Sequence, residues 1–262
     1  MRLPNELCKD IVHHITTKAD LYNLILTYPA LRYEAQRAML RRIDMSTCGS
    51  EENNRKNRQT IIQTFEFLSR NISLAGAVRR LHYQTAVISD ALLELLIPQM
   101  TNIKHLQFHI TPAAHLDPMH SSFLRCSWRL YSFALLGVPL ADPTNTISFL
   151  KARPTIVEFT MSTLSASLFT PEGILPHITT LSVYAPLQPL SLDAILLNRP
   201  ITRMKVGALS QLAECGSSAL QRIRVVSCFR AGNLPLPQFE NLEFLEVCEV
   251  CYIYGMAHSV LI

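Results

Sequence analysis

The sequence predicts an α/β chain in which a small N-terminal three-helix unit is followed by an α/β solenoid of short repeats. Two observations support this fold class. Apolar residues recur at helical spacing through the first 45 residues, and a short apolar pattern returns at near-constant intervals from Val78 onward. We therefore expect a helical domain at 1–45, a polar loop and linker helix at 46–76, and a repeat region at 77–262.

Three short helices are expected in the N-terminal unit. Leu7, Ile11 and Ile15 recur every four residues and share one face of the first helix. Asp20 is the expected N-cap of the second helix, whose apolar positions are Leu21, Leu24, Ile25 and Tyr28. Pro29 ends that helix, and the third, with Leu31, Ala35, Ala38 and Met39 on one face, is expected to have Arg41 and Arg42 in its last turn.

This segment is too small to be stable without help. About 40 residues bury too little surface to offset the conformational entropy of the chain. The apolar positions also outnumber those that three short helices can bury among themselves. The segment is therefore expected to bind a partner or to pack on the rest of the chain.

The same residues resemble a known family. The opening Leu3-Pro4-x-Glu6-Leu7, followed by Ile11, Ile15, Asp20-Leu21, Leu24 and Leu26, resembles the F-box. In that family the segment binds a Skp-type adaptor and through it a cullin, which links a substrate-recognising domain to a RING ubiquitin ligase. The segment also resembles the short F-boxes at the start of chains in expanded fungal families. The resemblance implies an adaptor-binding set of Leu3, Pro4, Leu7, Ile11, Ile15, Leu21 and Leu24.

The match covers about the first sixth of the chain and is incomplete. Many F-boxes continue with a hydrophobic-Ser-Lys-x-Trp run, where this chain has Thr27-Tyr28-Pro29-Ala30-Leu31-Arg32. This departure concerns the second half of the adaptor interface. The alternative is an N-terminal helical cap that buries its apolar residues on the segment that follows.

Composition excludes several classes of protein. Hydrophobic residues make up 48% and charged residues 17%, which is typical of a folded chain rather than a disordered one. The net charge is +4. The first 80 residues carry 13 Lys and Arg against 8 Asp and Glu, and the remaining residues carry 11 against 12, so neither part has the basicity typical of nucleic-acid binding. No signal peptide or membrane-spanning run is predicted. Seven cysteines without framework spacing indicate reduced thiols and a cytoplasmic or nuclear protein.

The segment between the two predicted domains is polar. Residues 46–59 are expected to form an exposed loop or hinge. Ile61, Ile62, Phe65 and Leu68 then mark one amphipathic helix that ends near Asn71.

From Val78 onward the chain repeats the pattern apolar-x-x-apolar-x-apolar. Its first residues lie about 23 positions apart, within the range of leucine-rich repeats, whose LxxLxL core it resembles. Each repeat is expected to hold one strand and one helix or irregular turn, and helix-like stretches occur at 89–100, 145–151 and 190–197. The eight predicted cores are Val78-Leu81-Tyr83, Ile103-Leu106-Phe108, Leu130-Phe133-Leu135, Ile156-Phe159-Met161, Ile178-Leu181-Val183, Ile201-Met204-Val206, Leu220-Ile223-Val225 and Leu242-Leu245-Val247.

The repeats depart from the family pattern in the turn that follows each strand. Leucine-rich repeats usually carry Asn or Cys three residues after the last core position, and here only Cys228 conforms. The alternative fold is an ordinary α/β domain with irregular strands. At the C-terminus the apolar Val260-Leu261-Ile262 follows the last repeat without a polar cap, which indicates either a truncated product or an end covered by a partner or by the chain itself.

The sequence contains no recognisable catalytic set. Cys248 and Cys251 form one CxxC without a second pair, on a predicted strand that would point the two thiols to opposite faces. His105, His109, His115 and His120 cluster in sequence, but buried thiols and ordinary histidines are favoured over a zinc site. No glycine-rich phosphate loop and no GxSxG motif occur. We expect a protein that is not an enzyme and uses no cofactor or metal.

Alternation along the predicted strands places two residues of each repeat on the outward face. In two neighbouring repeats these residues are Arg203, Lys205, Arg222 and Arg224, with Glu246 at the edge. Four cations this close repel one another unless an anion binds, so the hypothesis is a site for an acidic or phosphorylated segment of a target. The alternative is a solvated face with flexible side chains.

Two functions follow from these interpretations. The first is the substrate-recognition adaptor of an SCF-type cullin–RING ubiquitin ligase, with a Skp-type adaptor and an unknown target as partners. The second is a non-catalytic leucine-rich-repeat scaffold with no ligase connection. The two differ at Leu3, Pro4, Leu7 and Ile11, which a receptor leaves exposed and a helical cap buries.

Overall fold

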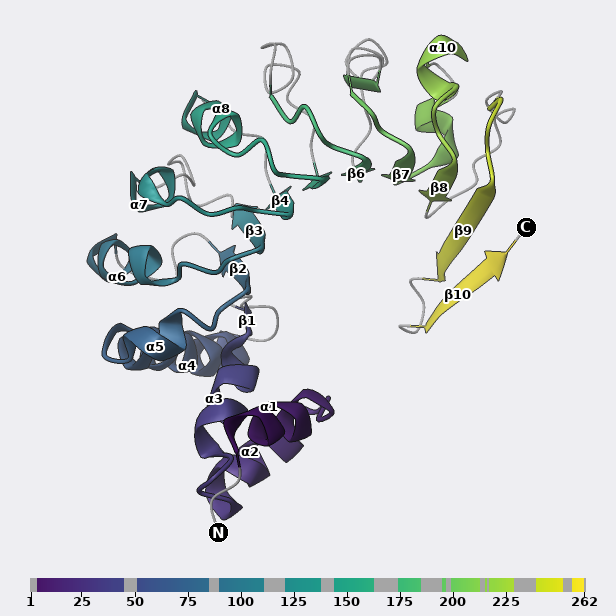
Figure 1. Cartoon of the computed structure of the whole chain (residues 1–262). Coiled ribbons are helices and arrows are strands. Elements are labelled where there is room, and N and C mark those ends of the chain that lie inside the picture. The colour runs from purple at the N-terminus through teal and green to yellow at the C-terminus, as the bar shows by residue number, and fades with distance from the viewer. Residues whose placement is uncertain are drawn as a thin grey trace. The chain divides into compact units, whose positions relative to one another are not determined.

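The computed structural model describes residues 4–44, 51–84, 90–110, 121–137, 144–162, 174–184, 195–196, 199–212, 215, 217–228, 239–251 and 256–261. The chain divides into two compact units, Met1–Leu106 with His120–Trp128 and Gln107–Met119 with Arg129–Ile262. Helices and strands alternate along both units, which confirms the α/β class (Figure 1).

In the first unit β1 pairs with β2 in parallel. In the second unit β4 to β9 are parallel neighbours in chain order, and β10 is antiparallel to β9. Parallel neighbours need a connection that returns to the same end of the sheet, and the helices lie in these connections.

The first unit is rich in helices. It contains α1 (Asn5–His13), α2 (Lys18–Thr27), α3 (Arg32–Leu40), β1 (Arg42–Asp44), α4 (Glu51–Ser69), α5 (Ile72–Ala75), β2 (Arg80–Gln84), α6 (Asp90–Leu96), η1 (Ile97–Gln99), the start of β3 (His105–Ile110) and α7 (Ser121–Arg125).

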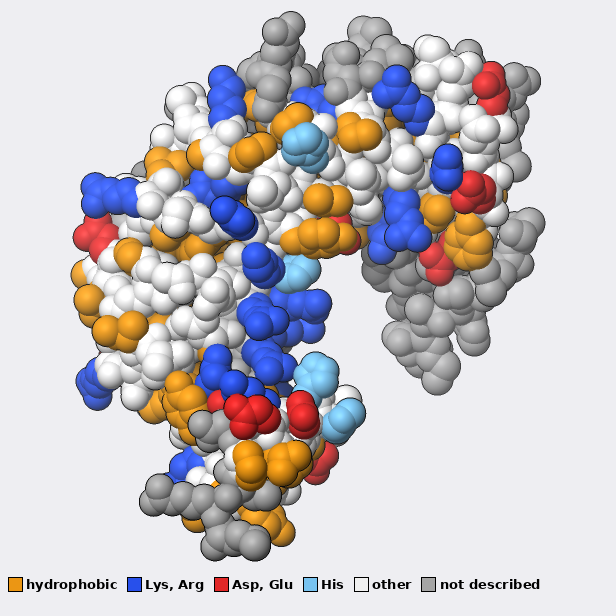
Figure 2. All heavy atoms as spheres, in the orientation of Figure 1, with side chains coloured by type: hydrophobic (Ala, Val, Ile, Leu, Met, Phe, Trp, Pro, Cys, Tyr) orange, Lys and Arg blue, Asp and Glu red, His pale blue; other side chains and the backbone are white. Residues whose placement is uncertain are grey.

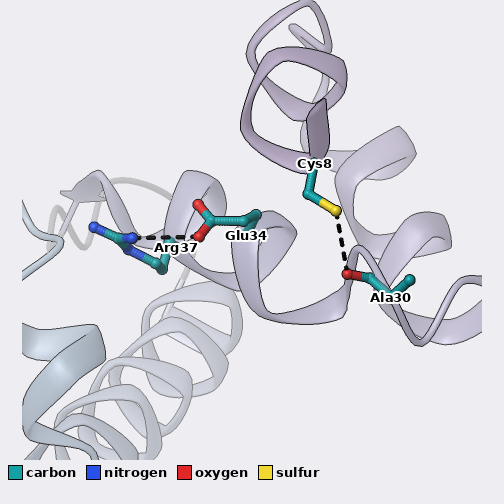
Figure 3. A network of polar contacts seen from close by, with 4 residues as sticks. All are labelled: Cys8, Ala30, Glu34 and Arg37. Carbon is teal, nitrogen blue, oxygen red and sulfur yellow. Dashed lines mark hydrogen bonds and ion pairs between the residues drawn. The ribbon is translucent and has the colours of Figure 1, made fainter. Parts of the chain in front are cut away.

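The helices α1, α2 and α3 share a small apolar core. Val12, Leu21 and Ala35 are buried together, one from each helix. Partly buried residues pack around them: Ile15, Leu24, Ile25, Ala38 and Met39. The Cys8 thiol donates to the Ala30 carbonyl at 3.7 Å, which ties α1 to the turn between α2 and α3 (Figure 3).

The structure corrects three local predictions in this unit. Thr17, rather than Asp20, is the N-cap of α2, because its side chain accepts a hydrogen bond from the Asp20 amide. Arg42 lies in β1 instead of the last turn of α3, because Ile43 is buried in the sheet opposite Leu81 of β2. Finally, α4 begins at Glu51, inside the segment 46–59 predicted to be a loop, because its Glu, Lys, Arg and Gln residues favour a helix as well as solvent.

The second unit contains the remaining strands with shorter helices. Its elements are the rest of β3, then β4 (Ser132–Gly137), α8 (Thr144–Lys151), β5 (Glu158–Met161), β6 (Thr180–Val183), β7 (Arg203–Val206), η3 (Leu209–Leu212), α10 (Ser217–Leu220), β8 (Val225–Cys228), β9 (Phe244–Cys251) and β10 (Met256–Leu261). The helix-like stretch expected at 190–197 is described only at 195–196, which are helical.

The predicted core positions are buried in the six repeats that begin at residues 78, 103, 130, 156, 178 and 201. In the second unit the aromatic members stack along the sheet, with the ring centroid of Phe133 5.9 Å from Phe159 and 5.3 Å from Phe149 of α8. Because the same strand position is apolar in each repeat, the parallel register aligns these side chains in one layer under the sheet.

The seventh repeat follows a different frame from the predicted Leu220-Ile223-Val225. The buried positions are Ile223, Val226 and Cys228, and Met204 of β7 pairs with Val226 of β8. Val225 instead occupies an outward position, opposite Arg203. Leu220 is also apolar and buried but belongs to α10. Because it stands three positions before Ile223, the sequence pattern matches both frames equally well.

The frame shift also corrects the expectation for Cys228. Its side chain is buried at the third core position of the repeat and is not a residue of the turn beyond it. Other side chains join successive repeats through backbone carbonyls. The Asn102 amide donates to the Gly76 carbonyl at 2.6 Å, and in the second unit the Asn241 amide donates to the Gln221 carbonyl at 2.7 Å.

The backbone repeats one hydrogen-bond arrangement where each strand begins. The Val157 carbonyl accepts from the amides of Thr179 and Thr180, and the Thr202 carbonyl accepts from those of Arg224 and Val225. One carbonyl per strand thus fixes the register of the next strand, which keeps the outward side chains in rows. None of the described helices is long and apolar enough to cross a membrane.

Candidate functional site

The helix α1 has two apolar stripes, one buried and one exposed to solvent. Cys8 and Val12 face inward, whereas Leu7 and Ile11 are 49% and 41% exposed. Pro4, which precedes the helix, is also exposed. Residues four apart lie on one face of a helix, so Leu7 and Ile11 present one apolar surface to solvent.

The other predicted adaptor-binding residues are less accessible. Leu21 is only 5% exposed, because it forms the core with Val12 and Ala35. Ile15 and Leu24 are partly buried against the same core, and Leu3 lies outside the described residues. Tyr22 and Leu26 lie four positions apart, so they share a face of α2, and both are exposed. The sequence did not distinguish Tyr22 from its buried apolar neighbours.

The predicted target-binding cations occupy two different settings in the second unit. Arg203 and Lys205 are exposed and alternate with the buried Met204 and Val206 along β7, as expected. Their in-register partners on β8 are Val225 and Ser227 rather than cations. Ser227 is in register with Lys205 on one side and with Glu246 of β9 on the other, and it donates to the Glu246 carboxylate at 2.9 Å. A negative charge therefore lies two strands from Lys205.

Arg222 and Arg224 lie before β8 and outside its outward rows, because of the frame shift in this repeat. Both side chains are exposed. Arg224 forms an ion pair with Glu243 at 3.4 Å, and both side chains of this pair are more than half exposed. The four predicted cations therefore form two separate pairs. Arg203 and Lys205 lie on β7, whereas Arg222 and Arg224 lie in the turn before β8, where Arg224 has an acidic partner.

Residues considered as metal ligands do not come together in the described part. His105 and His109 lie on β3, while His115 and His120 are outside the described residues. Cys248 and Cys251 lie on β9, as predicted. No group of three or more His, Cys, Asp and Glu side chains with metal-binding geometry occurs in the ranges that the structure covers.

Two buried arginines stabilise the helical side of the second unit. Arg153 donates to the Phe149 carbonyl at 3.0 Å and lies over the Phe149 ring. Arg199 donates to the Ile174 carbonyl at 3.1 Å, and burial lowers the pKa of its guanidinium. Both are buried and bind backbone carbonyls, so we assign them a structural role.

No family model matches the sequence, and no curated protein is similar to it.

Proposed function

We propose that this chain is the substrate-recognition subunit of an SCF-type cullin–RING ubiquitin ligase. In this proposal the helices α1 to α3 bind a Skp-type adaptor, and the strand repeats stack as a leucine-rich-repeat-like solenoid that binds the target protein. The chain performs no chemistry itself. It holds the target close to the conjugating enzyme and so raises the effective concentration of the acceptor lysine.

The exposure of Leu7 and Ile11 is the observation that carries the proposal. A cap would bury the apolar stripe of α1 on the repeats, whereas the free chain leaves about half of each side chain in water. An exposed apolar surface of this kind on a helix is typical of a protein-binding site. Together with the Leu3-Pro4-x-Glu6-Leu7 resemblance, it favours the receptor over a scaffold with no ligase connection.

Leu21 supports this binding surface indirectly. Its buried side chain holds α2 against α1 and α3. We assign direct adaptor contact to Pro4, Leu7 and Ile11, and a positioning role to Leu21.

The contribution of α1 can be measured as an affinity difference. Full burial of Leu or Ile stabilises by about 1.5–3 kcal/mol, and roughly half of each side chain is still exposed, so docking gains about 0.7–1.5 kcal/mol per residue. The double variant Leu7→Ala/Ile11→Ala should therefore weaken adaptor binding by about 10- to 150-fold in calorimetric titration.

The chain offers a matched control for this variant. Ile72 and Leu95 are exposed to a similar degree and lie in the same unit, on α5 and α6. Ile72→Ala/Leu95→Ala removes the same two side-chain types and should leave adaptor affinity within about twofold of wild type, as is usual for exposed substitutions outside an interface. Equal losses in both double variants, or no loss in either, would contradict the assignment of the adaptor site to α1.

A further inference from the structure

A second group of cations, which the sequence analysis did not identify, lies in the first unit where β1, β2 and β3 begin. Arg42 and Arg80 are the first residues of β1 and β2, and Arg41, Arg79 and Lys104 each directly precede a strand. All five side chains are exposed. Figure 2 shows Lys and Arg side chains gathered over these strands. We call these five residues the arginine surface.

The backbone fixes the arginine surface as two rows. The Arg41 carbonyl accepts from the amides of Arg79 and Arg80, and the Arg79 carbonyl accepts from those of Lys104 and His105. Residues 41, 79 and 104 are therefore equivalent and form the first row. Arg42 and Arg80 are register partners and form the second. Because neighbouring strands lie about 4.8 Å apart, the whole surface spans roughly 10 Å.

Little negative charge offsets this arrangement. Asp44 pairs with Arg42 at 3.8 Å and with His82 at 2.9 Å. No carboxylate of a described residue lies within 4 Å of the charged groups of Arg41, Arg79, Arg80 or Lys104. Like charges placed directly opposite on neighbouring strands destabilise a sheet, as do Arg42 and Arg80 here. A multivalent anion would relieve this repulsion.

We propose that the arginine surface binds a phosphorylated segment of the target protein, an inference that rests on the proposed receptor function. Four of its five cations are arginines, whose planar guanidinium groups bind phosphate oxygens through paired hydrogen bonds. A span of roughly 10 Å fits one or two phosphate groups on an extended peptide. The net charge of the whole chain is only +4, less basic than is typical of a nucleic-acid-binding protein.

The test is peptide binding by the full chain without adaptor. The probe is a fluorescein-labelled ten-residue peptide of Gly, Ala and Ser that carries two phosphoserines two residues apart, and the readout is fluorescence anisotropy at 50 mM and 500 mM salt. We expect binding that weakens at high salt and is lost with the unphosphorylated peptide. Arg79→Ser/Arg80→Ser should weaken binding by about tenfold or more, since hydrogen bonds to charged groups are lost.

Arg129→Ser/Lys151→Ser is the control, because it removes two exposed cations that lie in the other unit and outside both cation groups. The proposal predicts affinity within about twofold of wild type for this variant. Loss of binding in the control but not in Arg79→Ser/Arg80→Ser would overturn the proposal, as would no binding of the phosphopeptide. Tighter binding to a ten-nucleotide single-stranded DNA or to phosphatidylserine vesicles would also overturn it.

Thermal unfolding of each variant, monitored by circular dichroism, verifies that it is folded. Adaptor capture is measured separately and depends on α1, so the two proposals fail independently. If the chain binds the adaptor but does not bind the phosphopeptide, only the inference about the arginine surface is refuted.

Discussion

The frame of the seventh repeat can be tested with two neighbouring valines. Val226 is fully buried under the sheet, whereas Val225 lies on the outward face opposite Arg203. Val226→Ala removes two buried methyl groups at about 0.8 kcal/mol each, and the cavity left behind adds to this, so the free energy of unfolding should fall by about 2–3 kcal/mol. Val225→Ala removes the same atoms from a partly exposed site and should cost less than about 1 kcal/mol.

Urea denaturation of the full chain, monitored by far-ultraviolet circular dichroism, measures both effects. Circular dichroism is preferred over fluorescence because the single tryptophan, Trp128, belongs to the first unit. The slope of the free energy against urea concentration should stay unchanged in both variants. The Leu220-Ile223-Val225 frame predicts the opposite ranking, so a larger loss in Val225→Ala than in Val226→Ala would refute the observed register.

Two further predictions concern stability. Leu21 is buried and Leu26 on the same helix is 59% exposed. Leu21→Ala should therefore lower the free energy of unfolding of the N-terminal helices by about 2–5 kcal/mol, and Leu26→Ala should change it by less than about 0.5 kcal/mol. Equal effects in thermal denaturation would contradict the assignment of Leu21 to the core. Asn241→Ala should cost about 1 kcal/mol in urea denaturation, because the Gln221 carbonyl loses its hydrogen bond, and an unchanged midpoint would show that water replaces the amide without loss.

The sequence was most informative where one residue type recurs at one spacing. The predicted cores of six repeats are buried because three apolar positions per strand leave one frame that puts all of them under the sheet. The prediction failed at residues 220–228, where an apolar helix residue, Leu220, stands three positions before Ile223 and mimics the start of a repeat. Two overlapping matches cannot be separated by periodicity alone.

The charged surfaces were harder to predict than the core. The cations Arg203 and Lys205 followed from strand alternation, but Arg222 and Arg224 were placed by the wrong frame. The arginine surface was missed because Arg41 and Arg42 were assigned to a helix, so nothing indicated that they lie beside Arg79 and Arg80. Charged side chains carry no periodic signal of their own, and their positions depend entirely on the register of the apolar residues between them.

The exposed and buried stripes of α1 show a similar limit of prediction from the sequence. Leu7, Ile11 and Ile15 form a stripe at helical spacing, and so do Cys8, Val12 and Ile15. Spacing alone does not tell which stripe packs against the neighbouring helices. In the structure Cys8 and Val12 face α2 and α3, and Leu7 and Ile11 remain at the surface.

Co-elution with a Skp-type adaptor tests the central proposal most directly. The purified chain, mixed with the adaptor and passed through a size-exclusion column, should elute as a stoichiometric complex, and a Leu3→Ala/Pro4→Ala double variant should elute separately from the adaptor. A folded wild-type chain that elutes apart from the adaptor at micromolar concentrations would contradict the receptor function and favour a scaffold with no ligase connection.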